Sequence, residues 1–325
     1  MSNNDAPLSP ANPFRVAIVG HGFVGQAVEY AFTHPMVAFK LIDPKYNTSV
    51  DDLKEFDPQC VFVCAPTPSN DNGTVDSTIV ENAVLKTLYH TNALVVVKST
   101  VTPDVVQRLY NTMDRRQVDR FCYNPEFLTE KNAKADFVTA KFHVMGGSPQ
   151  ATQELIEIYD IFSGCESNDY HRMTAYEASF VKYTINSFLS TKITFFNQLY
   201  DLVNLYGCNY NTIVRAAGKD DRVGMGHTRV PGFDGKRGFG GACLPKDTRA
   251  FLDFSTHEFA DGTTTSFDLL HKVLDINSAY RVQYDLDERE KVNNITFVDF
   301  GGKNVDNGQT KEELEDKGDS DPINE

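Results

Sequence analysis

The chain has 325 residues, of which 41% are hydrophobic and 23% are charged, and these values predict a globular protein of about two domains. Its 31 basic and 45 acidic side chains give a formal net charge of −14, which argues against nucleic-acid binding because that function needs a broad positive surface. The sequence has no run of about 18 apolar residues that could span a membrane, and its polar N-terminus lacks the apolar stretch of a secretory signal.

The six cysteines are scattered along the chain, without the close pairs that are typical of a metal site or a disulfide scaffold. We therefore expect no metal centre and a reducing, cytoplasmic setting. Five of the thiols are expected to be buried and apolar: Cys60, Cys64, Cys122, Cys165 and Cys208.

Short apolar runs alternate with helical patterns through the first half of the chain. Residues 1–13 are polar and are expected to form a flexible arm. Strands are then predicted at residues 14–20, 38–43, 60–64, 93–98 and 142–145, with helices at 26–32, 79–89 and 151–162. Strands that alternate with helices imply right-handed crossovers and a parallel sheet. The predicted fold of residues 14–173 is therefore a doubly wound α/β, Rossmann-like domain.

Residues 174–285 have a helical pattern. Thr174 and Glu177 have the spacing of a capping box, and apolar residues then recur at helical spacing until Gly207, a typical C-terminal cap. This predicts a helix of about 32 residues, ~48 Å long, which would serve as a spine between domains or as a dimer interface. Further helices are predicted at 211–217, 248–254 and 266–280, which makes this domain all-α. Residues 286–325 are polar and acidic, and a solvated tail is expected there.

Residues 20–25 read Gly-His-Gly-Phe-Val-Gly, between a predicted strand and a predicted helix, which is the context that a dinucleotide-binding fingerprint needs. Gly20 permits a tight turn, Gly22 lets a pyrophosphate approach the backbone, and Gly25 allows close packing of helix on strand. Asp43 ends the next strand, where a carboxylate accepts the ribose hydroxyls and repels a 2′-phosphate. The pattern predicts an NAD site rather than an NADP site, and Lys45 is the one feature that weakens this preference.

Cys243 lies within Gly238-Phe-Gly-Gly-Ala-Cys-Leu-Pro-Lys-Asp247. Pro245 suits the first turn of a helix, so Cys243 is expected at a helix N-terminus beside Lys246, where a thiolate is favoured. The preceding glycines would let a substrate approach the thiol. These surroundings favour a nucleophilic cysteine over a buried apolar thiol.

Two other regions place polar side chains where ligands bind. Lys182 and Asn186 are four residues apart on the predicted long helix, so they share a face, although a solvated Lys–Asn pair would have the same spacing. Hydroxyl groups at residues 99–100 follow a predicted strand, and sheets of this kind bind ligands at the carboxyl ends of their strands. The loop at residues 124–130 supplies two carboxylates after a further predicted strand.

Six separated motifs occur in a characteristic order. They are Gly20-x-Gly-x-x-Gly25, Cys64-Ala-Pro-Thr-Pro68, Ser99-Thr-Val101, Asn124-Pro-Glu-Phe127, Glu177-x4-Lys182-x3-Asn186 and Gly238-Phe-Gly-Gly-Ala-Cys-Leu-Pro-Lys-Asp247. The ordered set covers about residues 14–285 and resembles the UDP-glucose/GDP-mannose dehydrogenase family, most closely the UDP-glucose 6-dehydrogenases.

The resemblance implies an enzyme that oxidises the C6 alcohol of a nucleotide sugar, UDP-glucose being the closest match, to a carboxylate with two NAD+ and one water. It implies that Cys243 traps the aldehyde as a thiohemiacetal, which is oxidised to a thioester and hydrolysed. Lys182 would stabilise the developing oxyanion, with Asn186 as its hydrogen-bonding companion. Asp247 would position or activate water.

The resemblance also implies the rest of the site. Thr100 would act with Asp247, and Glu126 would be an acid/base partner. NAD would contact Gly20, Gly22, Phe23, Val24, Gly25, Asp43, Lys45, Pro66, Thr67, Ser99, Thr100, Glu130 and Lys246. The nucleotide sugar would contact Glu126, Phe127, Leu128, Glu130, Lys182, Asn186, Arg222, Phe239 and Gly240. The central helical domain would form a homodimer, and Arg222 would reach across it to the substrate of the neighbouring subunit.

Two alternatives remain open. A β-hydroxyacid-type dehydrogenase would share the NAD domain and the Lys182–Asn186 pair, but it would transfer one hydride and would not need Cys243. Members of the family also carry a third domain that grips the nucleotide, and residues 286–325 are expected to be a degenerate acidic tail in its place. That expectation motivates the second alternative, a catalytically poor NAD or nucleotide-sugar binding protein or a partner subunit.

Overall fold

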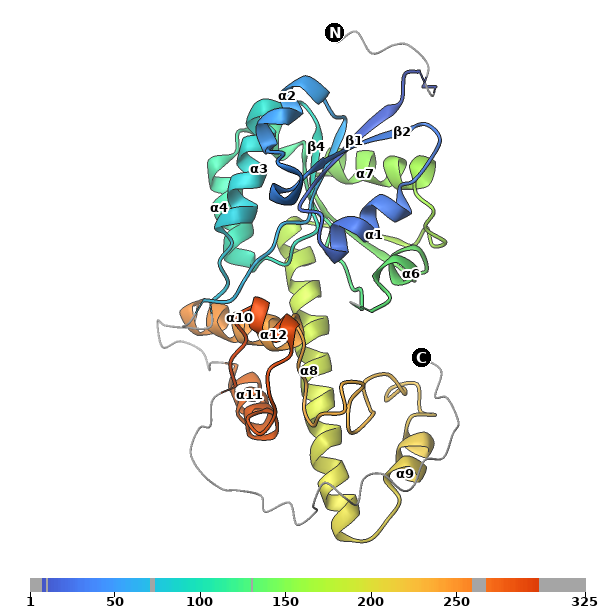
Figure 1. The fold of residues 1–325 in the computed structure, drawn as a ribbon, viewed down its shortest axis with the longest axis vertical. Helices are drawn as coiled ribbons and strands as arrows, with labels where there is room; N and C mark the ends of the chain where they lie inside the picture. Colours follow the sequence, from blue (N-terminus) through green and yellow to red (C-terminus); the bar gives the residue numbers. More distant parts are fainter. Residues whose placement is uncertain (1–7, 10, 71–73, 130, 259–266, 298–325) are drawn as a thin grey trace. The chain divides into compact units, whose positions relative to one another are not determined.

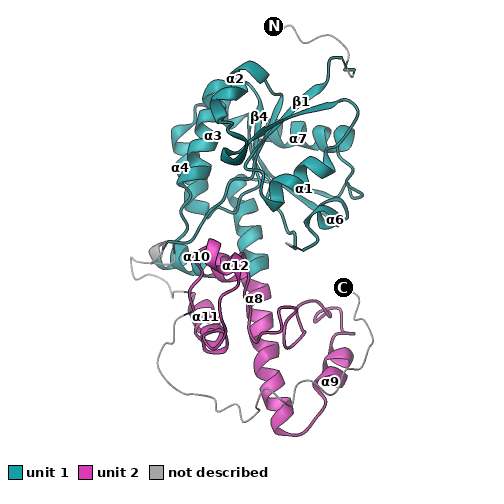
Figure 2. Cartoon of the chain, viewed as in Figure 1, with its two compact units in different colours: residues 1–186, 249–264 teal, residues 187–248, 265–325 magenta. Residues whose placement is uncertain are grey.

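The structure is a computed structural model that describes residues 8–9, 11–70, 74–129, 131–258 and 267–297. The chain divides into two compact units, residues 1–186 with 249–264 and residues 187–248 with 265–325 (Figure 2). This division lies inside the long helix, whereas the change of sequence pattern places a boundary after residue 173. Most of the expected N-terminal arm and of the acidic tail lies outside the described residues.

Unit 1 contains a seven-stranded sheet with the order β2-β1-β3-β4-β5-β6-β7. All neighbouring strands are parallel except β5 and β6. The strands are β1 (Phe14–Val19), β2 (Val37–Ile42), β3 (Cys60–Val63), β4 (Leu94–Val97), β5 (Phe121–Tyr123), β6 (His143–Gly147) and β7 (Tyr170–Met173). Because β2 and β3 lie on opposite sides of β1, the chain order reverses at β1, and such a reversal opens a crevice for ligands at the carboxyl ends of the strands.

Helices cover both faces of this sheet (Figure 1). Alternate residues of each central strand enter two separate cores, as the pleat requires. Val61 and Val63 of β3 pack into the core under α3 (Thr78–His90) and α4 (Pro103–Thr112). Cys60 and Phe62 pack into the core under α1 (Phe23–Ala31), α6 (Ala133–Val138) and α7 (Pro149–Phe162). The prediction of a doubly wound α/β domain is therefore confirmed, and its sheet is parallel as predicted except between β5 and β6.

The helices of unit 1 agree with the predicted positions where those exist, and six further helical elements were not predicted. The helical elements before the long helix are α1 (Phe23–Ala31), the 3₁₀ turns η1 (Pro44–Tyr46) and η2 (Val50–Asp52), α2 (Leu53–Phe56), α3 (Thr78–His90), α4 (Pro103–Thr112), α5 (Arg115–Val118), α6 (Ala133–Val138) and α7 (Pro149–Phe162).

The long helix α8 (Ala175–Leu205) has 31 residues and is continuous across the division between the units. Its start is a capping box, because Thr174 N–H donates to Glu177 Oε2 at 2.7 Å and Glu177 N–H donates to Thr174 Oγ1 at 3.2 Å. Gly207 follows with φ of +63°, the left-handed conformation that ends many helices. Both predicted ends of the helix are confirmed.

Unit 2 is helical in the residues that the structure describes. It comprises the part of α8 from residue 187, α9 (Tyr210–Ala217), the first turn of α10 (Leu244–Glu258), α11 (Asp268–Arg281) and α12 (Glu288–Val292). Helix α12 lies in the region expected to be a solvated tail, yet its Glu290 is fully buried. No helix in the described parts of the chain is both long and apolar enough to cross a membrane.

Candidate active site

The turn from β1 to α1 has the geometry of a phosphate cradle. Gly20 has φ of +88°, and a Cβ on it would lie 2.6 Å from the carbonyl oxygen of Cys64 at the end of β3. A Cβ on Gly25 would lie 2.2 Å from the carbonyl oxygen of Gly20, so the helix packs against the strand as the fingerprint requires. A Cβ on Gly22 would meet nothing within 4 Å. The open space over Gly22, at the start of α1, therefore fits a pyrophosphate at a helix N-terminus.

Asp43 lies directly after β2 and beside this turn. Its Oδ2 accepts from the backbone N–H of His21 at 2.7 Å, and its Oδ1 accepts from that of Lys45 at 3.0 Å. Burial opposes ionisation of the carboxyl, but these two N–H donors and the charge of Lys45 outweigh it, and the pKa of Asp43 is lowered. An ionised, oriented carboxylate at this position suits ribose hydroxyls and disfavours a 2′-phosphate.

His21 is a residue of this turn that sequence reasoning did not single out. Its ring is buried and bonds the hydroxyl of Tyr46 and the carboxylate of Glu29, both at 2.9 Å. The ammonium of Lys45 donates to the carbonyl oxygen of His21. These bonds tie the glycine turn to η1 and to α1, so Lys45 helps to hold the turn itself.

The hydroxyl-bearing residues after β4 and the segment after β3 lie at the same edge of the sheet, the one formed by the carboxyl ends of the parallel strands. The Ser99 hydroxyl is buried and donates to the carbonyl oxygen of Ala65 at 2.7 Å, while Thr100 is half-buried. Thr67 is buried and Pro66 is exposed. The structure thus places Ser99 and Thr100 on the edge of the sheet where the crevice opens.

Glu126 and Lys182 form a buried pair inside unit 1. The ammonium of Lys182 donates to the backbone carbonyl of Glu126 at 2.5 Å and lies 3.4 Å from its Oε1. The side chains are 4% and 7% exposed. Glu126 Oε2 accepts from Leu128 N–H at 2.6 Å, which fixes the carboxylate. Asn186 lies one turn further along α8 and is also buried. This ammonium is therefore desolvated and held in one place, as an oxyanion donor must be.

A second buried lysine, Lys98, was missed by sequence reasoning. Its ammonium donates to Asn124 Oδ1 at 2.9 Å, and the same oxygen accepts from the Tyr159 hydroxyl at 2.7 Å. Burial lowers the pKa of Lys98 to about 8, although the negative charge of Glu126 favours the ammonium. Lys98 thus anchors Asn124, two residues before Glu126. Its position at the end of a predicted strand was a usable signal, shared with residues 99–100.

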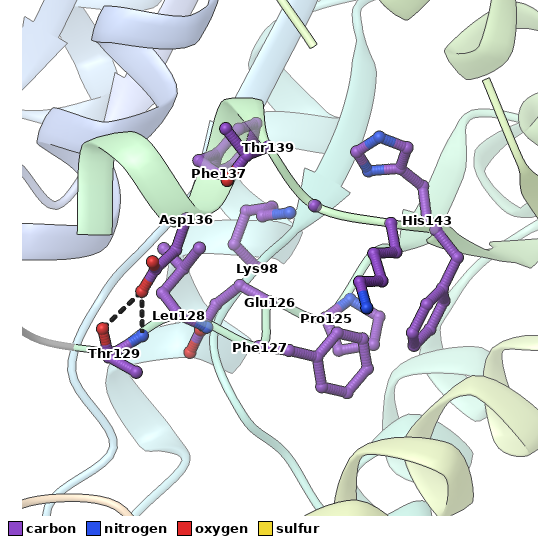
Figure 3. A pocket seen from close by; sticks show the side chains of 13 residues that line it. Lys98, Pro125, Glu126, Phe127, Leu128, Thr129, Asp136, Phe137, Thr139 and His143 are labelled. Carbon is purple, nitrogen blue, oxygen red and sulfur yellow. Dashed lines mark hydrogen bonds between the residues drawn. The ribbon is translucent and has the colours of Figure 1, made fainter. Parts of the chain in front are cut away.

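The loop that carries Glu126 lines a cavity of about 350 Å³, a size that suits a small ligand. Figure 3 shows Lys98 between the loop and the side chains that follow α6. The cavity is lined by Lys98, Pro125, Glu126, Phe127, Leu128, Thr129, Asp136, Phe137, Thr139, Ala140, Lys141, Phe142 and His143. Three residues that the resemblance assigns to the substrate, Glu126, Phe127 and Leu128, are therefore together on one wall. Glu130 lies outside the described residues.

In unit 2, Cys243 immediately precedes α10, as the sequence predicts. Its carbonyl oxygen accepts from Asp247 N–H at 2.8 Å, the first bond of the helix. The Lys246 ammonium donates to Asp247 Oδ1 at 2.6 Å, and both side chains are buried. Cys243 therefore occupies a helix N-terminus, a kind of position at which reactive cysteines occur.

The remaining cysteines differ from Cys243 in their surroundings. Burial raises the pKa of Cys64 to about 12 and raises that of Cys60 well above its usual range, so neither is an effective nucleophile at neutral pH. Cys122 is also buried, and Cys165 is half-buried. Cys208 is exposed, so the prediction that it is buried was wrong; it follows Gly207 at the end of α8, and none of the elements that the structure describes covers it.

Other residues that the resemblance assigns to the substrate also lie in unit 2. Phe239 is buried, and Gly240 is half-buried. Arg222 is highly exposed and bonds Asp220 through two guanidinium nitrogens, at 2.9 and 2.6 Å. Among the described residues, no group of three or more His, Cys, Asp or Glu side chains could hold a metal ion.

Comparison with protein families gives two adjacent matches of one family. Residues 43–163 match the NAD binding domain of the UDP-glucose/GDP-mannose dehydrogenase family, and residues 176–279 match its central domain. Together the two matches cover more than half of the chain. The chain belongs to this family. Its cofactor is NAD, in agreement with the glycine turn and with Asp43.

Individual relatives give the same result. The chain is 28% identical over 266 residues to a UDP-glucose 6-dehydrogenase of Rickettsia bellii, a match that covers 80% of this chain and 58% of that relative. It is 25% identical to a solved UDP-glucose dehydrogenase of Pyrobaculum islandicum, with a TM-score of 0.66 over 82% of this chain and 68% of that one. The chain thus spans little more than half the length of the first of these.

A third similarity concerns the fold alone. The Mycobacterium tuberculosis 3-hydroxyisobutyrate dehydrogenase is 16% identical, with a TM-score of 0.64, over 85% of this chain and 96% of that one. The doubly wound domain followed by a long helix is therefore shared with a dehydrogenase of another kind.

Proposed function

We propose that the protein is an NAD-dependent nucleotide-sugar 6-dehydrogenase that oxidises the C6 alcohol of UDP-glucose to give UDP-glucuronate. The observation that carries this proposal is the position of Cys243 at the N-terminus of α10, after a glycine-rich loop. A dehydrogenase that stops at a carbonyl has no use for such a thiol, whereas oxidation to an acid needs a nucleophile that forms and releases an acyl group.

The proposed reaction assigns a covalent role to Cys243. Its thiol adds to the C6 aldehyde to give a thiohemiacetal, whose oxidation leaves a thioester on the sulfur. Water then hydrolyses the thioester, releasing the carboxylate and restoring the thiol. NAD+ held at the Gly20–Gly25 turn would accept the hydride in each of two oxidations, of the C6 alcohol to the aldehyde and of the thiohemiacetal to the thioester, with one proton released in each. Asp247, with Thr100, positions the water.

The buried ammonium of Lys182 stabilises the oxygen on which negative charge develops, with Asn186 as a second donor. The hydrogen bond from the Lys182 ammonium to the backbone carbonyl of Glu126 keeps this ammonium oriented before substrate binds. The Glu126 carboxylate, fixed by Leu128 N–H, serves as the acid/base partner of the alcohol.

Turnover of UDP-glucose with NAD+ by the purified chain tests the proposal. The mechanism predicts two NADH per sugar and an acid product. It also predicts that Cys243→Ser abolishes formation of the acid, while Cys208→Ser, at an exposed thiol, leaves it unchanged. One NADH per sugar with a stable carbonyl product, or unimpaired acid formation by Cys243→Ser, would contradict the role of the cysteine.

The second candidate is a β-hydroxyacid-type dehydrogenase that transfers one hydride. It is favoured by the shared fold with the 3-hydroxyisobutyrate dehydrogenase, almost all of which this chain covers. A panel of UDP-glucose, GDP-mannose, an N-acetylhexosamine nucleotide and small 3-hydroxy acids separates the two reactions. Nucleotide-sugar binding in calorimetry without turnover would indicate a binding protein or a partner subunit instead.

We also propose that the chain forms a homodimer through α8. Phe188, Phe195 and Leu202 are seven residues apart along this helix and are 62%, 60% and 53% exposed. Side chains at this spacing share one helix face, and an exposed apolar stripe of this length is typical of a protein interface.

A further inference from the structure

The backbone of the loop that precedes Cys243 is held by buried amide side chains of unit 2. Gly238 N–H donates to Asn197 Oδ1 at 3.0 Å. Phe239 is held at both of its backbone groups, because its N–H donates to Asn277 Oδ1 at 2.7 Å and its carbonyl accepts from Asn277 Nδ2 at 2.9 Å. Both asparagines are buried. The first half of the loop therefore has very little freedom.

A buried ion pair holds the second half of the loop. Gly241 N–H donates to Glu290 Oε1 at 3.1 Å, and the same oxygen accepts from Arg281 Nη2 at 2.5 Å. Arg281 Nη1 donates to Asp234 Oδ2 at 2.7 Å. The side chains of Arg281 and Glu290 are 1% and 0% exposed. One carboxylate oxygen thus joins α11, α12 and the loop.

Two glycines of the loop are explained by these contacts. A Cβ on Gly238 would lie 2.4 Å from Asn277 Oδ1. A Cβ on Gly240 would lie 2.2 Å from Arg281 Nη2 and 2.3 Å from Glu290 Oε1. The glycines are therefore needed for the polar side chains to reach the backbone, in addition to any approach of a substrate.

Stability alone does not account for this arrangement. A buried ion pair usually contributes less to stability than well-packed apolar side chains of the same volume. Arg281 Nε is buried and has no hydrogen-bond partner among the described residues, which adds a further unfavourable contribution. What the charged groups provide, and apolar ones could not, is an acceptor for the N–H of Gly241, two residues before Cys243.

We propose that Arg281 and Glu290 are positioning residues that fix the Gly238–Gly241 loop and thereby hold the Cys243 thiol at the start of α10. This inference rests on the proposed function, in which Cys243 is the nucleophile. Both residues lie beyond residues 176–279, the segment that matches the central domain of the family. Helix α12 lies in the segment that the sequence predicts to be a solvated tail. It therefore has a structural role instead, because it carries Glu290 and so helps to hold the loop before Cys243.

The first test compares two Glu→Gln substitutions on α12. Glu290→Gln removes the charge that pairs with Arg281 and leaves only a neutral, weaker acceptor for Gly241 N–H, while Glu288→Gln changes an exposed residue of the same helix that pairs with Lys291. All variants carry Cys208→Ser, so that the exposed thiol does not compete for iodoacetamide. We expect Glu290→Gln to slow alkylation of Cys243, followed by peptide mass spectrometry, and to lower kcat by about 10–100-fold, the loss that follows a small displacement of a reacting group. The KM for NAD+ should not change. Glu288→Gln should match the parent in the alkylation rate of Cys243, in kcat and in the KM for NAD+.

The second test separates positioning from structural support. The double variant Arg281→Met with Glu290→Met removes both charges and replaces them with apolar side chains, an exchange that buried ion pairs often tolerate. Urea unfolding measures its stability. We expect alkylation of Cys243 and kcat to stay low even where stability equals that of the parent, because Gly241 N–H has lost its acceptor. Parental alkylation and kcat in a stable double variant would overturn the inference.

Failure of the proposed function gives a different result. If Cys243→Ser still formed the acid, the nucleophile would be wrong, yet the alkylation rates of Cys243 in the Glu290→Gln and Glu288→Gln variants would still report whether the loop is held by the ion pair. Equal alkylation rates in those two variants would overturn the positioning role, whatever the reaction.

Discussion

We propose that the carboxylate of Asp43 makes the protein favour NAD+ over NADP+. Two backbone N–H groups orient it, and the lowered pKa keeps it charged. We expect Asp43→Asn to raise the KM for NAD+ about tenfold, because a hydrogen bond to a charged group contributes ~1.5–3 kcal/mol and ~1.4 kcal/mol is a factor of ten. The ratio of kcat/KM for NAD+ over NADP+ should fall, since the repulsion of a 2′-phosphate is lost.

A matched control for this substitution is Asp57→Asn. Asp57 precedes β3 and pairs with Arg15 at 3.0 Å, at the amino ends of the strands and away from the glycine turn. Its substitution should leave both cofactor constants unchanged. An unaltered NAD+/NADP+ ratio in Asp43→Asn would assign the discrimination to another residue.

Lys98 gives a prediction for the pH dependence of stability. Its pKa is about 8 in the folded protein against 10.5 for a free lysine, so between these values the unfolded chain binds the proton and the folded chain does not. The free energy of unfolding therefore rises with pH in this window. Relative to Lys98→Met, the wild type should gain about 3 kcal/mol between pH 8 and pH 10.5, at ~1.4 kcal/mol per pKa unit. Urea unfolding at several pH values measures this difference.

The control for Lys98 is Lys141→Met, which removes an exposed ammonium beside the same cavity. The wild type and Lys141→Met should show the same pH dependence of stability. A difference between wild type and Lys98→Met that stays constant from pH 7 to pH 10.5 would mean that Lys98 is not desolvated as the structure has it.

At the level of single residues, the sequence predicts best where a residue belongs to a local motif. Gly20, Asp43 and Cys243 are each marked by a motif whose other residues lie within a few positions in the sequence. The structure places all three at the positions that the sequence predicts. Lys98 and Glu290 have no such motif, and a lone lysine or glutamate is usually exposed. Lys98 is buried by contacts with residues far along the chain, and its place at the end of a predicted strand is the signal that the sequence offers. Glu290 contacts Arg281 and Gly241, and the short helix that carries it gives no such signal.

At the level of elements, the turn from β1 to α1 separates two roles of glycine. Gly25→Ala places a methyl group 2.2 Å from the Gly20 carbonyl oxygen, so α1 must move from β1. We expect a loss of about 1–3 kcal/mol in the free energy of unfolding, as is usual for overpacking, together with loss of NAD+ binding. Urea unfolding and calorimetric titration with NAD+ measure the two effects.

Gly22→Ala is the matched substitution in the same turn. Its methyl group meets nothing within 4 Å and should leave the stability unchanged, but it fills the space through which the pyrophosphate approaches the backbone. NAD+ binding should therefore weaken without a change in unfolding. Equal NAD+ affinity in Gly22→Ala and wild type would mean that the cofactor does not use this cradle.

The elements themselves were predictable to different degrees. The buried strands β1, β3 and β4 are continuous apolar runs, and the long helix carries both of its end signals, so these follow from the sequence. Strand β7 reads Tyr-His-Arg-Met and is largely exposed, so it has neither the apolar run nor the alternation that marks a strand. It pairs with β6 in parallel, and its Tyr170 ring contacts the ring of His143 on that strand. Helix α12 has five residues, too few for a helical period to be recognised.

At the scale of the whole molecule, the division between the units separates the residues that the proposed reaction uses. The cofactor turn, Glu126 and Lys182 belong to unit 1, while Cys243 and Asp247 belong to unit 2. Each unit holds some of these groups in fixed positions. In unit 1 the buried ammonium of Lys182 is bonded to the backbone carbonyl of Glu126. In unit 2 the Gly238–Gly241 loop is held in place before α10. Because the proposed reaction uses residues of both units, we expect that neither unit expressed alone would turn over UDP-glucose.

The exposed stripe on α8 gives the prediction for assembly. Phe195 lies at its centre, and we expect Phe195→Asp to turn a dimer into a monomer, because burying a charge in an apolar interface is unfavourable by several kcal/mol. Asn204→Asp introduces the same residue about 180° around the helix, at 100° per residue, and should leave the dimer intact. Light scattering at several protein concentrations measures the mass of each variant.

The same pair of variants tests the role expected of Arg222. Its guanidinium is highly exposed and bonds only Asp220 among the contacts of its own chain that the structure describes, as a residue that serves a neighbouring subunit would be. If it reaches the neighbour's substrate, Phe195→Asp should raise the KM for UDP-glucose as much as Arg222→Ala does in the dimer. The KM for NAD+ should change in neither. If Phe195→Asp is monomeric but keeps the parental KM for UDP-glucose, the dimer through α8 is supported, but Arg222 does not contact the neighbour's substrate.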